Sequence, residues 1–296
     1  MKKNLFAFSL LLLQARLLAQ DTLPNALLWE ISGHNLTEKS YLYGTIHLIP
    51  KEDFFLPTGF DQSFENAKTL YLELDLNEMN DMSKMMSIMD KCYMKDDKKL
   101  SDLISKEDYE MVSSKFQEMG LPMMIFEHMK PLFLSSLTAM EGSDPKELNS
   151  DQMKSYEMVF MDKANLRKMP LKGIETTEFQ LSIFDSIPYE VQAKSLVESL
   201  KNTDISSDVS LKGLIELYKK QNLNKLSETV ETGDQYLKPY MDIMVKNRNK
   251  TWIPIISEAM KNGSCFFAVG AGHLGGTYGL IKLLRENLYS VKPVHN

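Results

Sequence analysis

The chain has 296 residues, of which 43% are hydrophobic and 25% charged, and its formal net charge is −6 at pH 7. This length suits one large domain or two small ones, and the composition excludes a disordered or fibrous chain. The acidic balance, with no basic run interleaved with aromatic residues, argues against nucleic acid as a partner, because phosphate backbones are bound by clustered Lys and Arg.

The N-terminus has the layout of a secretory signal peptide. Two lysines precede an apolar stretch over residues 5–13, and Ala19 offers a small residue at a cleavage position. We therefore predict a leader over residues 1–20 and an exported mature chain over residues 21–296, in the periplasm or outside the cell. The apolar stretch is shorter than the ~20 residues that cross a bilayer, so we expect no membrane span after cleavage. An uncleaved anchor is the alternative.

Short segments rich in aromatic and aliphatic residues predict the strands of one sheet, since turn or polar residues bound each of them. We expect strands over residues 29–32, 40–46, 69–76, 169–174, 264–269 and 289–294.

Long amphipathic stretches between these strands predict a large helical body. We expect helices over residues 106–119, 124–140, 148–167, 178–200, 208–221, 233–244 and 249–261, with Pro188 breaking the 178–200 stretch. The layout is that of an α/β (α+β) fold with a mixed central sheet rather than a regular βαβ alternation. We expect a single domain with its helical insertions around residues 78–168 and 178–262.

One of these amphipathic segments carries methionines at helical spacing: Met79, Met82, Met85, Met86 and Met89. The stripe favours adaptable packing, in the core or at a partner interface. Binding of a soft metal such as Cu(I) is a second interpretation, and it is disfavoured because no Cys or His accompanies the methionines.

The cysteine pattern contains only Cys92 and Cys265. An exported protein could join them in one disulfide, and the spacing leaves that open. The absence of a C-x-x-C motif excludes a zinc ribbon or a thioredoxin-type site.

Two G-x-x-H motifs end predicted strands and are the main chemical signal in the chain. The first places Gly44 before His47, and the second places Gly270 and Gly272 before His273. Ligands of open α/β sheets bind at the carboxyl ends of strands, so we expect the two histidines to converge. The three glycines would allow tight turns and close backbone approach, and both imidazoles are candidate ligands for a divalent metal.

Two acidic residues complete this pattern. Glu73 interrupts an apolar strand, and Glu175 ends another. A carboxylate among apolar residues needs a cation, a metal or a proton as its partner. Histidines with carboxylates supply what a hydrolytic metal site needs. The plainer alternatives are that the motifs coincide by chance, and that Glu175 caps the next helix together with Thr176 and Thr177.

These motifs, taken together, resemble the TraB/GumN family, whose superfamily includes the Tiki-type metalloproteases. The resemblance runs over almost all of the mature chain. It rests on the ordered set of GTIH, LELD, KGIET and VGAGH, on Arg248-Asn249 followed by Trp252, and on the flanking helices.

The resemblance implies a fold like that of the erythromycin-esterase and haem-binding-lipoprotein superfamily, with the active site between two pseudo-repeated halves. It makes His47 and His273 metal ligands or catalytic histidines, with Glu73 and Glu175 as acidic partners. It also places Arg248 on a helix that faces the cleft, where it could clamp a carboxylate or stabilise an oxyanion.

One departure from the family pattern concerns the helix before the central strand. Relatives often carry a G-x-D-x-H-like pattern there, whereas this chain keeps the acid as Glu157 and has Val159 at the histidine position. We therefore expect the metal site to have fewer ligands than in those relatives.

The leading functional hypothesis is an exported metal-dependent hydrolase of peptide or ester bonds, a peptidase first of all, with a peptide or small-molecule substrate. The metal, Mn²⁺, Co²⁺ or Zn²⁺, would be held by His47, His273 and Glu73 or Glu175, with the other glutamate as base. A metal-free esterase-type hydrolase with a histidine base is one alternative. A non-enzymatic exported protein that binds haem or a small ligand is the other.

Overall fold

A six-stranded mixed sheet forms the centre of the protein in a computed structural model that describes residues 22–139, 153–201 and 210–294. The strand order is β6-β4-β7-β2-β1-β8. Its strands are β1 (Leu28–Gly33), β2 (Ser40–Thr45), β4 (Thr69–Leu72), β6 (Leu171–Gly173), β7 (Cys265–Gly270) and β8 (Tyr289–Pro293). The mixed α/β class expected from the sequence is confirmed. The predicted leader over residues 1–20 lies outside the described residues.

The strand directions bring the carboxyl ends of four neighbouring strands to one edge of the sheet. β2, β7, β4 and β6 are parallel neighbours, whereas β1 is antiparallel to both β2 and β8. β4 is shorter than the predicted strand over residues 69–76. The chain leaves the sheet after Leu72, and Asp75 caps a short 3-10 helix, η1 (Leu76–Asn80), by accepting a hydrogen bond from the backbone N–H of Asn77.

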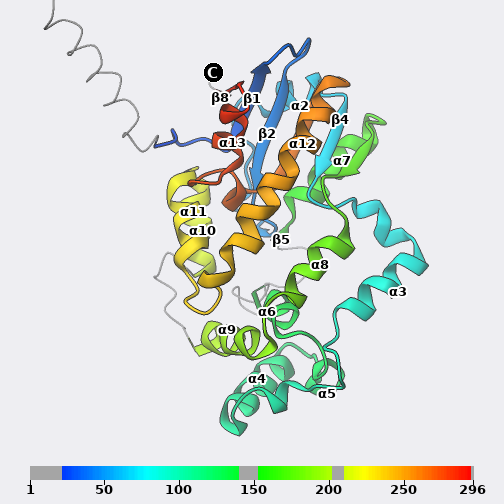
Figure 1. Cartoon of the computed structure of the whole chain (residues 1–296), viewed down its shortest axis with the longest axis vertical. Coiled ribbons are helices and arrows are strands. Elements are labelled where there is room, and N and C mark those ends of the chain that lie inside the picture. The colour runs from blue at the N-terminus through cyan, green and yellow to red at the C-terminus, as the bar shows by residue number, and fades with distance from the viewer. Residues whose placement is uncertain (1–21, 140–152, 202–209, 295–296) are drawn as a thin grey trace, which may run out of the picture.

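Helices cover both faces of this sheet (Figure 1). Successive side chains of a strand point to opposite faces, and Phe266 and Phe267 of β7 show the two environments. The ring of Phe266 contacts the rings of Phe60 and Phe160 from the helices behind the sheet, whereas Phe267 contacts Tyr71 on the other face. The covering helices are α2 (Phe60–Asn66) and α7 (Tyr156–Leu166) on the first face and α12 (Asn247–Lys261) and α13 (Leu280–Glu286) on the second.

A separate two-stranded sheet ties together two segments that are distant in the sequence. β3 (Ile49–Pro50) pairs in antiparallel fashion with β5 (Met153–Lys154). β3 follows His47 along the chain, and β5 precedes α7. This pairing therefore brings the first G-x-x-H motif next to the beginning of α7.

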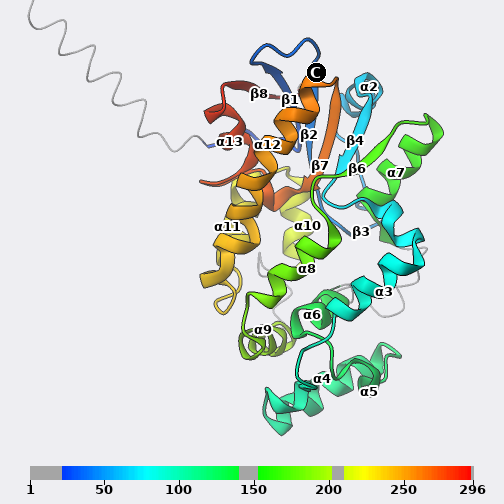
Figure 2. The ribbon, with the colours of Figure 1, turned by 45° about the vertical axis from the view of Figure 1, so that its right-hand side comes forward.

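A helical body extends away from the sheet, and α4, α5, α6 and α9 lie at its far end (Figures 1 and 2). It has its own apolar core, which includes Val112, Phe116, Leu134 and Leu196. Further helices are η2 (Leu100–Asp102), α3 (Met82–Lys91), α4 (Lys106–Glu118), α5 (Met123–Phe126), α6 (Pro131–Ala139), α8 (Thr177–Asp185), α9 (Tyr189–Lys201), α10 (Leu211–Lys219), α11 (Leu223–Thr232) and the 3-10 helix η5 (Ala271–His273).

Of three helix predictions, one is confirmed and two differ from the structure. The break at Pro188 is confirmed, because α8 ends at Asp185 and α9 begins at Tyr189. The single helix predicted over residues 124–140 is two helices, α5 and α6, and a helix begins again at a proline, whose fixed φ suits a first helical position. In place of a helix over residues 233–244 there are a 3-10 turn, η3 (Lys238–Tyr240), and a π-helix, η4 (Asp242–Lys246).

Three methionines of the stripe, all on α3, face solvent. α3 has no buried residue, and Met82, Met86 and Met89 are 75%, 68% and 41% exposed. The interpretation of the stripe as core packing is therefore wrong, whereas its interpretation as a partner interface stays a prediction.

The two cysteines do not form a disulfide. Cys92 and Cys265 are both free and buried, the first in the core of the helical body and the second in β7. Within the described ranges, the protein has no helix that is both long and apolar enough to cross a membrane.

Candidate active site

The side chains predicted at strand ends do lie at one edge of the sheet. His47, Glu73, Glu175 and His273 follow the ends of β2, β4, β6 and β7, respectively, by one to three residues. Because these four strands are parallel neighbours, their carboxyl ends are adjacent, and this is the edge where open α/β sheets bind ligands.

Arg248 on α12 joins three of these residues in a buried cluster. Its Nη2 lies 2.6 Å from Glu73 Oε2 and 2.6 Å from Glu175 Oε1, and its Nε lies 3.1 Å from Glu175 Oε1. Its Nη1 lies 3.1 Å from His273 Nε2 and also donates to the backbone oxygen of Met244, at 3.2 Å. The side chains of Arg248, Glu73 and Glu175 are only 10%, 11% and 4% exposed.

This network uses the whole hydrogen-bonding capacity of the guanidinium group. Arginine has five N–H donors and no acceptor, and one Nε, two Nη1 and two Nη2 donors match the partners of Arg248. The carboxylates that Arg248 clamps are the protein's own. In this arrangement it has no donor left for the oxyanion of a substrate.

The helix that carries Arg248 contributes two further site residues. Arg248, Asn249 and Trp252 are all buried on α12, and the spacing i, i+4 places Arg248 and Trp252 on one face. The indole Nε1 of Trp252 donates to Glu175 Oε2 at 2.8 Å, and its ring centroid lies 4.6 Å from that of His273. The π-helix η4 directly precedes α12 and supplies the carbonyl of Met244; such wide turns are frequent at functional sites.

The glycines of the two motifs permit close packing around the cluster. A Cβ at Gly270 would lie 3.3 Å from Glu73 Oε1, which the backbone N–H of Gly270 reaches at 2.7 Å. A Cβ at Gly44 or Gly272 would lie 3.1 or 3.0 Å from its nearest neighbours. None of the three glycines has a positive φ. Close approach, rather than a left-handed turn, is what these positions require.

Charges within the cluster hold Glu73 ionised. Burial alone would raise the pKa of Glu73, but His273, Arg248 and His47 together lower it to about 2. Burial disfavours the charged imidazole of His273, and with the nearby Arg248 charge it lowers that pKa to about 4. Although burial opposes it, the two carboxylates raise the pKa of Arg248. At neutral pH Glu73 is therefore a carboxylate, Arg248 a guanidinium and His273 a neutral imidazole.

His47 differs from the other three strand-end residues because its side chain is 76% exposed. Its Nδ1 lies 3.1 Å from Glu157 Oε1, and that hydrogen bond raises the pKa of His47 to about 9. Glu157 is itself held by the hydroxyl groups of Thr45, at 2.8 Å, and Ser155, at 3.0 Å. Within the described part of the chain, Nε2 of His47 has no hydrogen-bond partner.

The sequence patterns did not predict the roles of several residues of the site. Glu157 was noted only as a retained acid, and Asn249 and Trp252 only as part of a resemblance. The i, i+1, i+4 spacing of Arg248, Asn249 and Trp252 was a usable signal, since it groups them on a helix. Gln180, whose Nε2 lies 3.3 Å from Glu73 Oε2, carries no local signal.

The proposed helix-capping role of Glu175 is wrong. The N-cap of α8 is Thr176, whose hydroxyl accepts a hydrogen bond from the backbone N–H of Phe179 at 3.1 Å. The carboxylate of Glu175 instead contacts Arg248 and Trp252.

The donor set, as arranged, does not fit a divalent cation. Each carboxylate oxygen of Glu73 and Glu175 already accepts an N–H, and Nε2 of His273 accepts from Arg248. Across residues 22–139, 153–201 and 210–294, no three His, Cys, Asp or Glu side chains are grouped so that they could hold a metal ion. The guanidinium group takes the place that a cation would occupy between the carboxylates.

Comparison with known proteins connects this geometry to one family. A family model described as the TraB/PrgY/gumN family matches residues 27–293, a span that contains every residue of the site. Searches of curated proteins and of solved structures gave no match. This chain belongs to the TraB/PrgY/gumN family.

Proposed function

We propose that this protein is a hydrolase of peptide or ester bonds and that His47 is the group that transfers protons. The observation that carries the proposal is the pair formed by His47 and Glu157. A solvent-accessible imidazole is oriented through Nδ1 by a carboxylate that is only 16% exposed, at the edge of the sheet where ligands bind.

The chemistry follows from the way in which this pair is built. In neutral His47, Nδ1–H donates a hydrogen bond to the carboxylate of Glu157, so the lone pair of Nε2 faces solvent. His47 would take a proton from a water molecule as that water attacks the scissile carbonyl. The imidazolium would then return the proton to the departing nitrogen or oxygen, so that one water is consumed and His47 is regenerated.

The buried cluster supports this role electrostatically. The negative charges of Glu157 and Glu73 both favour the protonated form of His47, whereas Arg248 opposes it. The three carboxylates of the site carry one negative charge more than Arg248 and protonated His47 together, which favours the imidazolium formed as the water attacks. Glu73 and Glu175 thus act through the field that they create, with Arg248 holding both in place.

The mechanism predicts how the rate of hydrolysis changes with pH, because only unprotonated His47 can act as the base. With a pKa of about 9, His47 is mostly protonated at pH 7, and its basic form increases with pH. We expect kcat/KM to rise about tenfold per pH unit from pH 7 and to level off above the pKa. A rate that falls over this range would contradict a base role for His47.

The test uses two probes, fluorescein-labelled casein for peptide bonds and p-nitrophenyl butyrate for ester bonds. We expect His47→Gln to lose about 10²- to 10⁴-fold in kcat/KM, because a general base contributes that much. His34→Asn is the matched control: His34 lies in an exposed turn with a positive φ that Asn tolerates, and activity should not change. Full activity of His47→Gln would overturn the proposal. So would the failure of the wild-type protein to hydrolyse either probe, which would favour the binding-protein alternative.

The same assay tests the metal dependence expected from the sequence. Hydrolysis by the His47–Glu157 pair should survive exhaustive chelation. Loss of activity that Mn²⁺, Co²⁺ or Zn²⁺ restores would contradict the metal-free mechanism, and would require Arg248 to release Glu73 and Glu175.

We propose that hydrolysis takes place outside the cytoplasm. The support is the predicted leader, with its basic start, short apolar stretch and small residue at the cleavage position. A mature chain beginning at residue 20 or 21, measured by mass spectrometry of the exported protein, is the expected result. A cytoplasmic chain that retains residues 1–20 would contradict it.

A further inference from the structure

We infer that Asn249 is a positioning residue that fixes the tautomer of His273 and, through it, the orientation of Arg248. Asn249 is fully buried on α12, next to Arg248 in the sequence, and it touches neither Glu73 nor Glu175 in the hydrogen-bond network. The inference deepens the proposed function and rests on it only for the expected effect on turnover.

The orientation of the Asn249 amide follows from its backbone partners. Its Nδ2 lies 3.1 Å from the carbonyl oxygen of His273 and 2.8 Å from that of Tyr278. Carbonyl oxygens can only accept, so both require the NH₂ end of the amide. The oxygen end, Oδ1, therefore faces Nδ1 of His273 at 2.7 Å, and Nδ1 must carry the proton.

The opposite side of the imidazole leads independently to the same assignment. Nε2 of His273 lies 3.1 Å from Nη1 of Arg248. A guanidinium group can only donate, so Nε2 must be the unprotonated nitrogen. Two neighbours of fixed polarity thus require one state, the neutral imidazole with its proton on Nδ1. A ring buried to this degree, beside a positive charge, is also expected to be neutral.

The direction in which these hydrogen bonds are donated determines whether Arg248 can stay bound to Glu73 and Glu175. The chain of hydrogen bonds runs from Asn249 through His273 to Arg248, and ends on Glu73, where Nη2 lies 2.6 Å from Oε2. If the proton of His273 moved to Nε2, that N–H would face an N–H of Arg248. The repulsion would displace the guanidinium from its shared position between Glu73 and Glu175. The hydrogen bond on one ring nitrogen decides the state of the other, and Asn249 makes that bond.

Asn249 also ties down the turn that follows His273. Its second amide proton reaches Tyr278, the residue before the N-cap of α13. The same side chain therefore holds the imidazole ring, the backbone of His273 and the far side of the turn. A residue that merely packed in the core would not need these three polar contacts.

The direct test reads the tautomer by long-range ¹⁵N–¹H correlation NMR on the full mature chain labelled with ¹⁵N-histidine. His273→Gln identifies the His273 signals among those of the five histidines. In the wild type we expect the Nδ1-protonated pattern. Asn249→Leu should convert His273 to the Nε2-protonated form or to a mixture. It should also lower kcat by up to about 100-fold, because a displaced Arg248 would misplace the charged groups of the site.

Two further variants separate the tautomer from general destabilisation. Asn249→Asp keeps an acceptor for Nδ1–H and should retain the wild-type tautomer, with kcat above that of Asn249→Leu. Asn224→Leu removes an amide that also bonds backbone groups, both of Leu23, but far along the chain from the site. It should reduce stability and leave the His273 signals unchanged.

Wild-type His273 protonated on Nε2, or an unchanged tautomer in Asn249→Leu, would overturn the inference. Should Asn249→Leu not fold, the Asn249→Asp spectrum decides, since an Nε2-protonated ring in that variant would also overturn it. If the tautomers behave as expected while the wild-type protein hydrolyses neither probe, the inference holds and the proposed function fails.

Discussion

The sheet edge and the helical body bury their charges in different ways. At the sheet edge one guanidinium serves two carboxylates, so the buried cluster of Arg248, Glu73 and Glu175 keeps an excess negative charge. In the helical body Lys130 is 1% exposed and is matched by Asp185, at 2.7 Å. A buried ion pair with balanced charge is typical of a structural contact. An excess of charge at strand ends is typical of a site that acts on a ligand.

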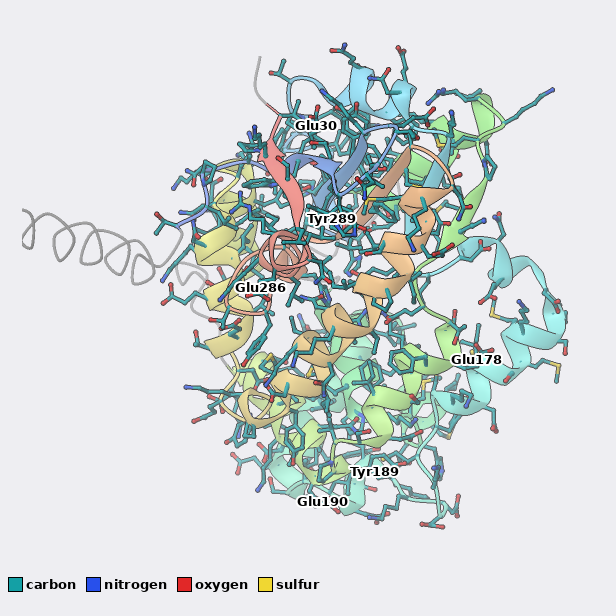
Figure 3. The ribbon with its side chains drawn as sticks, turned by 45° about the horizontal axis from the view of Figure 1, so that its top comes forward. Glu30, Glu178, Tyr189, Glu190, Glu286 and Tyr289 are labelled. Carbon is teal, nitrogen blue, oxygen red and sulfur yellow. The ribbon has the colours of Figure 1, made fainter. Side chains whose placement is uncertain are left out.

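In Figure 3, Glu30 and Tyr289 mark the part of the sheet that lies away from the helical body, and Tyr189 and Glu190 on α9 mark the helical end. The carboxyl edge with the site faces the helical body, because α8, which follows Glu175, runs from this edge to α9 (Figure 1). The sheet carries the larger apolar core, and the helical body has a smaller core of its own. The chemistry therefore rests on strands packed on both faces, and damage to the helical body should leave it largely intact.

The largest expected effect comes from breaking the charge arrangement at the sheet edge. Arg248→Met leaves Glu73 and Glu175 buried without a counter-charge, and we expect a loss of about 3–5 kcal/mol in the free energy of unfolding. Arg248→Lys keeps the charge without the planar fork, so it should lose less. Urea unfolding measures both, and Arg167→Met, which removes an exposed arginine bonded to the carbonyls of Phe64 and Glu65, is the control. A stability of Arg248→Met equal to that of the wild type would mean that the cluster is not a unit.

An intermediate effect is expected in the helical body. Gln192 is fully buried and serves three backbone groups there: it accepts from the N–H of Leu132 and donates to the carbonyls of Phe184 and Ile187. Gln192→Leu leaves these groups unpaired, which should cost roughly 2–3 kcal/mol. Hydrogen exchange should then speed up in α6, α8 and α9 but not in β2 and β7. Equal loss of protection in the sheet would show that the two regions unfold together.

The smallest effect is expected on α3. Met82→Ser and Met86→Ser change side chains that are 75% and 68% exposed, so the free energy of unfolding should stay within about 0.5 kcal/mol. Met123→Ser is the matched control, since Met123 is 5% exposed and its truncation should cost about 2–4 kcal/mol. Calorimetry measures all three variants. A large loss for the α3 variants would indicate that the stripe is covered in solution.

Local patterns were enough to predict much of the fold and part of the site. The strands, the helix break at Pro188 and the positions of His47 and His273 at strand ends follow from short-range rules: apolar runs, proline geometry and glycine-containing ends. Glu73 and Glu175 stood out because a carboxylate in an apolar strand needs a partner. These properties depend on a residue and its close neighbours in the sequence.

The tertiary structure decided which groups meet, because those contacts join segments far apart in the chain. The strand order places four carboxyl ends side by side, the β3–β5 pairing brings Glu157 to His47 across 110 positions, and α12 inserts Arg248 between Glu73 and Glu175. Three further features depend on distances and burial in the folded chain. They are the use of all five N–H donors of Arg248, the position of the proton on Nδ1 of His273, and the exposure of the methionines on α3. A linear pattern of residue types does not contain those quantities, so only the folded chain determines them.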